Sequence, residues 1–100
     1  MLPPKPRKHA PSRAEAEALA TQAFGFLAAE PERIMRFLSL TGIAAERVRR
    51  AASEPGFLPA VLDYLLNDES LLVAFATESG IEPEAVVAAR AAIEGPAAIR

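Results

Sequence analysis

Apolar residues recur every three or four positions along most of the chain from Ser12 to Ile93. This spacing is typical of amphipathic helices, and no segment alternates apolar and polar residues over five or more positions, as a strand would. The pattern therefore predicts an all-α fold of six helices. Three are expected at about 12–29, 31–41 and 45–52, one after the turn at 54–56, one between Asp68 and Gly80, and one between Pro83 and Gly95.

Residues with strong end preferences mark where these helices begin and end. The segment from Ser12 to Glu15 has the S-x-x-E pattern of a capping box. Glu30 and Asp68 are expected to accept free backbone N–H groups at the starts of the second and fifth helices. Gly42 and Gly80 each follow the last apolar turn of a helix, which suits the left-handed position beyond a helix end.

The apolar stripes also predict which side chains of the shorter helices face the core. The third helix is expected to bury mainly Val48 and Ala52. The sixth helix is expected to bury Val86, Val87 and Ile93.

The chain repeats itself at a constant offset of 38 residues, since 24–48 aligns with 62–86 without a gap. A fixed period of this size is typical of repeated architecture. We therefore predict two tandem three-helix units, at about 12–54 and 55–95. With 22 alanines, each unit has few large side chains of its own, so we expect both to share one core. The identical pairs are Leu27/Leu65, Phe37/Phe75, Gly42/Gly80, Ile43/Ile81, Glu46/Glu84 and Val48/Val86.

The ends of the chain differ from its centre in composition. Residues 1–11 contain four prolines and three basic side chains, so we predict a disordered basic tail before a single domain at 12–95. Residues 96–100 are expected to be a flexible C-terminus. We expect a cytoplasmic protein with no membrane segment, because the chain has no cysteine, no signal-like apolar run after its basic start and no apolar span of membrane length.

Charge separates the two halves of the predicted domain. Residues 24–56 hold five arginines and four acids, whereas 62–94 hold seven acids and Arg90 alone. The two copies therefore kept the apolar pattern but not the charge. A site that uses charge is expected where the copies differ.

Few residues offer catalytic or metal-binding chemistry. His9 is the only histidine and lies in the predicted tail, which excludes a histidine-dependent triad within the domain. Asp63, Asp68 and Glu69 could be an acidic metal or acid/base cluster, but capping of the fifth helix is the favoured explanation for the latter two. We expect no enzymatic activity, no bound metal and no cofactor.

The corners at Gly42 and Gly80 resemble the turn of a helix-turn-helix motif. The helix after Gly80 is acidic and would be repelled by DNA. Arg47, Arg49 and Arg50 follow Gly42, so nucleic-acid binding through these three arginines is an alternative function.

Two segments of the chain resemble a known family. FGFLAAEPERIMRFLSLTGI and FLPAVLDYLLNDESLLVAFATESGI carry its FL-x-x-[DE]-P-E junction, its L-T-G-[IL] corner and its L-D-x-L-L-x-D-E-S-L run. The sequence is similar to short bacterial, mainly alphaproteobacterial, helical proteins of domain-of-unknown-function family 3572. The resemblance implies a bacterial cytoplasmic helical protein and brings no catalytic residues.

The favoured function is a small interaction module that binds a protein partner or forms a homo-oligomer. Such a module would use an apolar groove where alanine-rich faces leave larger side chains partly uncovered. The large residues at the copy junction, Phe57, Leu58, Tyr64 and Leu65, are the candidate surface, although each is also a natural core residue.

Overall fold

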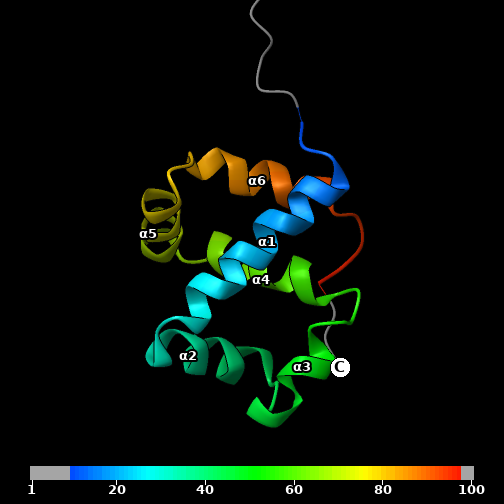
Figure 1. The fold of residues 1–100 in the computed structure, drawn as a ribbon, viewed down its shortest axis with the longest axis vertical. Helices are drawn as coiled ribbons and strands as arrows, with labels where there is room; N and C mark the ends of the chain where they lie inside the picture. Colours follow the sequence, from blue (N-terminus) through cyan, green and yellow to red (C-terminus); the bar gives the residue numbers. More distant parts are fainter. Residues whose placement is uncertain (1–9, 98–100) are drawn as a thin grey trace, which may run out of the picture.

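The computed structural model describes residues 10–97, and within this range it contains six α-helices, one 3-10 helix and no strand (Figure 1). The predicted all-α class is therefore confirmed. Most of the predicted N-terminal tail, with His9, and residues 98–100 of the predicted C-terminus lie outside the described residues. The elements are α1 (Arg13–Ala28), α2 (Pro31–Thr41), η1 (Ala45–Arg47), α3 (Val48–Ala51), α4 (Phe57–Leu66), α5 (Glu69–Ser79) and α6 (Pro83–Ala92).

Two of the three predicted N-terminal caps are formed by side chains. The backbone N–H of Glu15 donates to Ser12 Oγ at 3.0 Å, and Ser12 N–H donates to Glu15 Oε1 at 2.9 Å, which is a complete capping box. The Asp68 carboxylate accepts from the N–H of Leu71 at 3.1 Å. The expectation for Glu30 was wrong, because its side chain makes no capping hydrogen bond. Pro31 follows it and lacks an N–H, so fewer donors at this end need a partner.

Both glycine corners have the left-handed backbone that the sequence predicts. Gly42 and Gly80 have φ of 78° and 70°. The N–H of Ile43 donates to the carbonyl of Leu38 at 3.2 Å, and Ile81 N–H donates to the carbonyl of Ala76 at 3.0 Å. These six-residue closures are Schellman motifs, and they turn the chain sharply after α2 and after α5.

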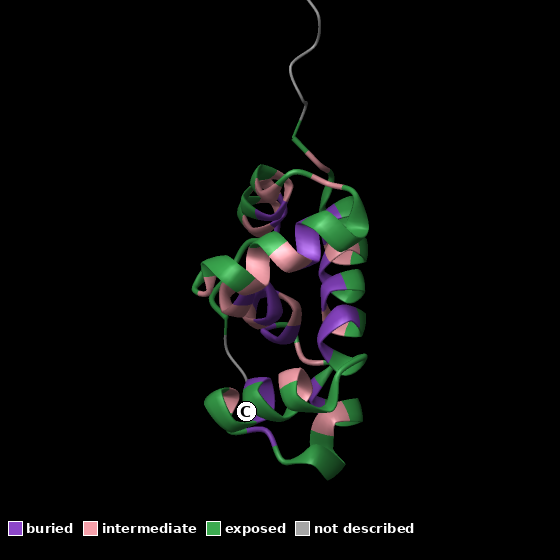
Figure 2. Ribbon diagram, turned by 90° about the vertical axis from the view of Figure 1, so that its left-hand side faces the viewer, coloured by how far each residue is buried: buried purple, intermediate pink, exposed green. Residues whose placement is uncertain are grey.

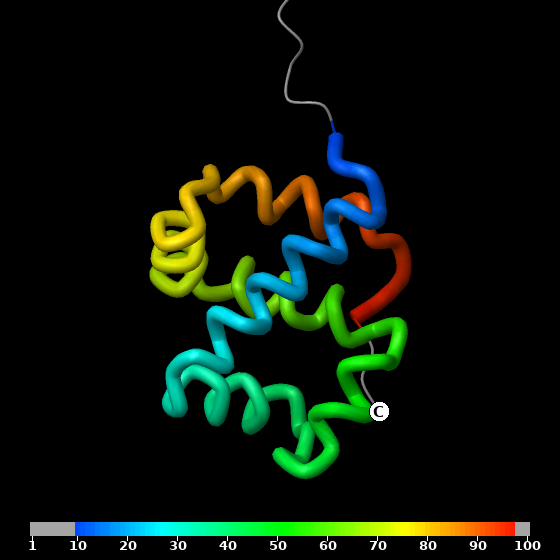
Figure 3. The backbone as a smooth tube through the Cα atoms, in the orientation of Figure 1, coloured from blue at the N-terminus to red at the C-terminus, as the bar shows by residue number. Residues whose placement is uncertain are grey.

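The centre of the fold is the packing of α1 against α4 and α6, which also contact each other. Ala16, Ala20 and Ala23 of α1 are fully buried, and side chains this small allow helix axes to approach closely. In Figure 3 α1 crosses in front of α4, with α6 and α2 on opposite sides of it. The buried residues in Figure 2 gather on the inward faces of these helices. One core therefore joins the two halves of the chain.

Aromatic rings connect the outer helices to this centre. Phe37 of α2 lies edge-on to Phe57 and Tyr64 of α4, with ring centroids 6.0 and 5.2 Å apart. Phe26 of α1 packs against Phe75 of α5 at 5.3 Å. Aromatic pairs at these separations stabilise a fold by more than their buried area alone.

The prediction of two tandem three-helix units is not confirmed. The second helices do correspond, since α2 and α5 each have 11 residues and end at a left-handed glycine. The third helices differ: α6 has 10 residues and packs against α1 and α4, whereas α3 has only four.

Two predicted core positions are corrected. Ala51 is 4% exposed and takes the place predicted for Ala52, which is exposed. The chain begins this segment as the 3-10 helix η1, whose tighter winding changes the direction of the residues that follow. Val87 is 54% exposed, because the buried stripe of α6 runs through Val86 and Ala89, and adjacent helix positions point about 100° apart.

Candidate functional site

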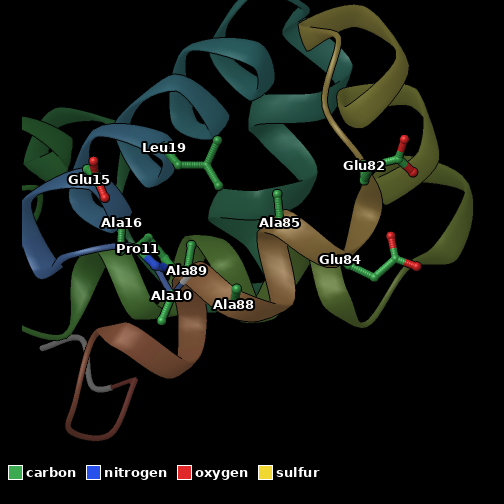
Figure 4. Close-up of a pocket in the computed structure, with 10 residues that line it drawn as sticks. All are labelled: Ala10, Pro11, Glu15, Ala16, Leu19, Glu82, Glu84, Ala85, Ala88 and Ala89. Carbon is green, nitrogen blue, oxygen red and sulfur yellow. The ribbon is translucent and has the colours of Figure 1, made fainter. Parts of the chain in front are cut away.

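A groove of about 500 Å³ lies between the start of α1 and α6 (Figure 4). Ala16 and Ala89 are buried in it, while Leu19, Ala85 and Ala88 are half-buried. Its walls are therefore mostly apolar. The full lining is Ala10, Pro11, Glu15, Ala16, Leu19, Glu82, Glu84, Ala85, Ala88 and Ala89.

The groove follows from the small residues that face each other on α1 and α6. Alanines bring the two helices close along their contact. Beside that contact, Ala85 and Ala88 lie next to Leu19 but are too short to fill the space in front of it. The same residues that build the core thus leave a depression at its edge.

Three glutamates border the groove, and no basic residue among those described lines it. Glu15 is held by the capping box, where its Oε1 accepts the N–H of Ser12. Glu82 and Glu84 are exposed, and neither side chain forms an ion pair or hydrogen bond with another residue in the part of the chain that the structure describes. Figure 4 shows this pair at the end of the groove remote from Ala10 and Pro11. The groove is apolar inside and negative at its edges.

The surface predicted at the copy junction divides into core and half-buried residues. Phe57 and Leu65 are 1% and 0% exposed and belong to the core, so they offer no surface to a partner. Leu58 and Tyr64 are half-buried and pack against that core.

Tyr64 lies in a small depression that it shares with Arg36 and Asp68. Burial raises the pKa of the Tyr64 hydroxyl, Arg36 partly opposes this effect, and the Asp68 carboxylate adds to it. Burial of the ring therefore favours the neutral form of its hydroxyl.

The three candidate nucleic-acid arginines are exposed. Arg47 ends η1, while Arg49 and Arg50 lie on α3. Arg47 and Arg50 line two shallow depressions of about 250 and 260 Å³, the second shared with Glu46. The helix expected at 45–52 is instead a 3-10 turn followed by four α-helical residues, which is short for a helix that reads a DNA groove.

The predicted acidic cluster is divided among separate structural roles. Asp63 accepts a hydrogen bond from Arg90 Nε at 2.8 Å. Asp68 caps α5, and Glu69 lies exposed in its first turn. Across residues 10–97, no group of three or more acidic or histidine side chains is placed to hold a metal ion.

Sequence reasoning missed the groove residues Leu19, Ala85 and Ala88. Part of the signal was present, because alanines at 85, 88, 89 and 92 recur with helical spacing, as do those at 16, 20 and 23. Such small-residue stripes indicate close helix contact. Which two stripes meet depends on how α1 and α6 cross, and that is a property of the tertiary structure.

A family model described as "Protein of unknown function (DUF3572)" matches residues 13–96. The chain belongs to this family. The match covers all six α-helices and both walls of the groove, and it confirms the family resemblance seen in the sequence. No curated protein and no solved structure matches the chain. Among the described helices, none is long and apolar enough to cross a membrane.

Proposed function

We propose that this protein is a small helical interaction module that binds an apolar peptide segment with basic residues in the groove between α1 and α6. The observation that carries the proposal is the groove itself, about 500 Å³ in volume and walled mainly by alanine and leucine, in which the charged lining residues of the described chain are all acidic. An apolar floor gives affinity through burial. A negative border selects a positively charged segment.

The lining favours a peptide over a small metabolite or a substrate. Ligand pockets for small molecules combine apolar walls with a few placed polar groups, whereas no polar or charged side chain is buried anywhere in residues 10–97. Within that range, no hydroxyl, amide or imidazole side chain lines this groove. The proposal therefore assigns binding and no catalysis to the protein, and places it in the cytoplasm as the sequence indicates.

Peptide display can test this proposal because the method requires no identified partner. A random peptide library would be selected on the immobilised full chain, on Ala88→Trp, which fills the groove, and on Ala91→Trp. Ala91 is exposed on α6 and does not line the groove, so the last variant is a matched control.

The expected result is enrichment of apolar peptides rich in Lys and Arg on the native chain and on Ala91→Trp, but not on Ala88→Trp. Binding should weaken with salt, because exposed charges are screened. Enrichment that survives Ala88→Trp, or no enrichment of basic over acidic peptides, would exclude the groove as the binding site.

Nucleic-acid binding is the second candidate, supported by the exposure of Arg47, Arg49 and Arg50. The short α3 and the neighbouring Glu46 make it the weaker one. If these arginines contact phosphates, duplex affinity should fall with salt with a log–log slope of about −2.7 for three contacts. Replacing all three by alanine should then abolish a duplex mobility shift that Arg13→Ala leaves intact.

A further inference from the structure

We infer that the N-terminal segment of this same chain, residues 1–9, docks in the groove between α1 and α6. The inference rests on the proposed function, since it names an occupant for the same groove. It follows from where the described chain starts, from the reach of the preceding residues and from their charge.

The described chain starts within the groove. Ala10 and Pro11 line it together with the first turns of α1 and with α6. Figure 4 places these two residues at one end and the Glu82–Glu84 pair at the other. The segment before Ala10 thus joins the domain at one end of the groove, and the Glu82 and Glu84 carboxylates lie at the other end.

Two of the three charges on the segment fall within the length of the groove. From Ala89 to the Glu82–Glu84 pair, α6 rises by roughly 8–10 Å at 1.5 Å per residue. Lys8, Arg7 and Lys5 precede Ala10 by two, three and five residues. At about 3.1 Å per residue in an extended proline-type backbone, Lys8 and Arg7 would fall roughly 6 and 9 Å from it, within this length, and Lys5 roughly 16 Å from it, beyond the glutamate pair. Basic side chains can therefore reach the carboxylates when the segment runs along α6.

The chemistry of the segment also fits the groove walls. Its sequence, MLPPKPRKH, has three basic residues, no acidic residue, and prolines at 3, 4 and 6. Prolines restrict the free chain to extended conformations, so less conformational entropy is lost on docking into an apolar groove. Covalent attachment at Ala10 gives the segment an effective concentration of millimolar order, which allows weak contacts to fill the groove.

The docked segment acts as a built-in competitor. A partner peptide must displace it. The segment also indicates which peptides the groove accepts, namely extended, proline-containing and basic ones. Reversing the three charges of the segment should therefore strengthen the binding of an external basic peptide.

Paramagnetic relaxation in the full chain tests this inference. The protein has no cysteine, so Pro4→Cys gives one site for a nitroxide label. Strong broadening is expected at the amides of Glu84 and Ala85, with much less at Ala91 on the outer face of α6. The combined change Lys5→Glu, Arg7→Glu and Lys8→Glu should lower the ratio of docked to free segment about tenfold, as expected when the surface ion pairs with Glu82 and Glu84 are lost. These residues lie before the described domain, so the change leaves its core intact.

Two outcomes would overturn the inference. Broadening that is the same in the native and charge-reversed chains would show that the segment only passes near the groove. Broadening of an isotope-labelled chain by a separate spin-labelled chain would place the segment in the groove of a second copy instead. Peptide selection on the charge-reversed chain separates this inference from the proposed function. Peptides that bind the charge-reversed chain but not its Ala88→Trp variant support the groove as a binding site, whether or not the segment docks.

Discussion

The guanidinium of Arg90 joins the Asp63 carboxylate at 2.8 Å and links α6 to α4, the two helices that face α1 in the core. The same side chain donates to the carbonyl oxygens of Ile93 at 2.8 Å and Gly95 at 3.2 Å. It therefore closes the end of α6 and fixes the chain beyond it. Arg90 is the single basic residue of 62–94, a segment that also holds seven acidic residues. The structure gives this arginine a structural role.

Loss of Arg90 should destabilise the protein more than loss of an exposed arginine. We expect Arg90→Ala to lower the free energy of unfolding by about 1–2 kcal/mol, because charge-assisted hydrogen bonds to partly buried acceptors are lost together. Arg13 forms an exposed i,i+4 pair with Glu17, so Arg13→Ala should cost about 0.5 kcal/mol or less. Urea denaturation measures both. Equal losses in the two variants would contradict the structural role of Arg90.

The glycines divide into two classes with opposite expected effects. Gly80 has φ of +70°, so Gly80→Ala should cost about 1–2 kcal/mol, the strain of a side chain in the left-handed region. Gly25 lies within α1, and an added Cβ there would meet nothing within 4 Å. Gly25→Ala should therefore stabilise the fold by roughly 0.5–1 kcal/mol. Thermal unfolding of the two variants beside the parent chain checks the signs, and a gain of stability in Gly80→Ala would refute the first.

Local signals in the sequence predicted the elements well. The Ser12 to Glu15 capping box, the Asp68 cap and both glycine corners depend on residues within about five positions of one another, and the structure confirms each. Such interactions are set by backbone geometry that neighbouring residues determine.

Contacts that depend on how the helices cross could not be predicted from the sequence. Arg90 and Asp63 are 27 positions apart, and the groove needs α1 to lie across α6. To predict that Ala51 and not Ala52 is buried, one would need to know that η1 forms. The candidate partner surface divided for a related reason. Core was already the more probable place for Phe57 and Leu65, but their burial was not known until their neighbours in the fold were known.

Tyr64 should titrate at a higher pH in the folded chain than in the unfolded chain. Burial raises its pKa above the ordinary 10.0, with Asp68 adding to and Arg36 opposing the effect. A raised folded pKa means that this contribution to stability is fully present below pH 10.0 and is lost as pH rises through the folded value. Tyr64 is the single tyrosine and tryptophan is absent, so tyrosinate absorbance reports it alone.

The expected result is a titration midpoint above that of the chain unfolded in urea. Tyr64→Phe should reduce the loss of stability that the native chain shows as the solution becomes alkaline. Coincident midpoints in the folded and unfolded chains would show that burial of the ring does not affect its hydroxyl.

A larger side chain on α1 should lower the stability of the fold on the buried face of the helix but not on its exposed face. Ala20 is fully buried and Ala18 is exposed. We expect Ala20→Leu to destabilise by about 1–3 kcal/mol through overpacking, and Ala18→Leu to change stability by less than about 0.5 kcal/mol. Urea midpoints of the two variants measure the difference, and a neutral Ala20→Leu would mean that α1 is less closely packed than its buried alanines indicate.

The N-terminal half alone should not fold, because the buried face of its longest helix, α1, is covered by helices of the other half. The alanine face of α1 packs on α6 and α4, and the Phe24 and Phe37 rings lie against Phe57 at 5.1 and 6.0 Å. A fragment of residues 12–56 keeps α1 to α3 but loses every one of these contacts, and a chain this short buries too little surface to compensate. Circular dichroism should show little helix and no cooperative thermal transition. Addition of a second fragment, residues 57–100, should restore helix in the mixture if the core is shared, whereas a cooperative transition in the first fragment by itself would show that the two halves have separate cores.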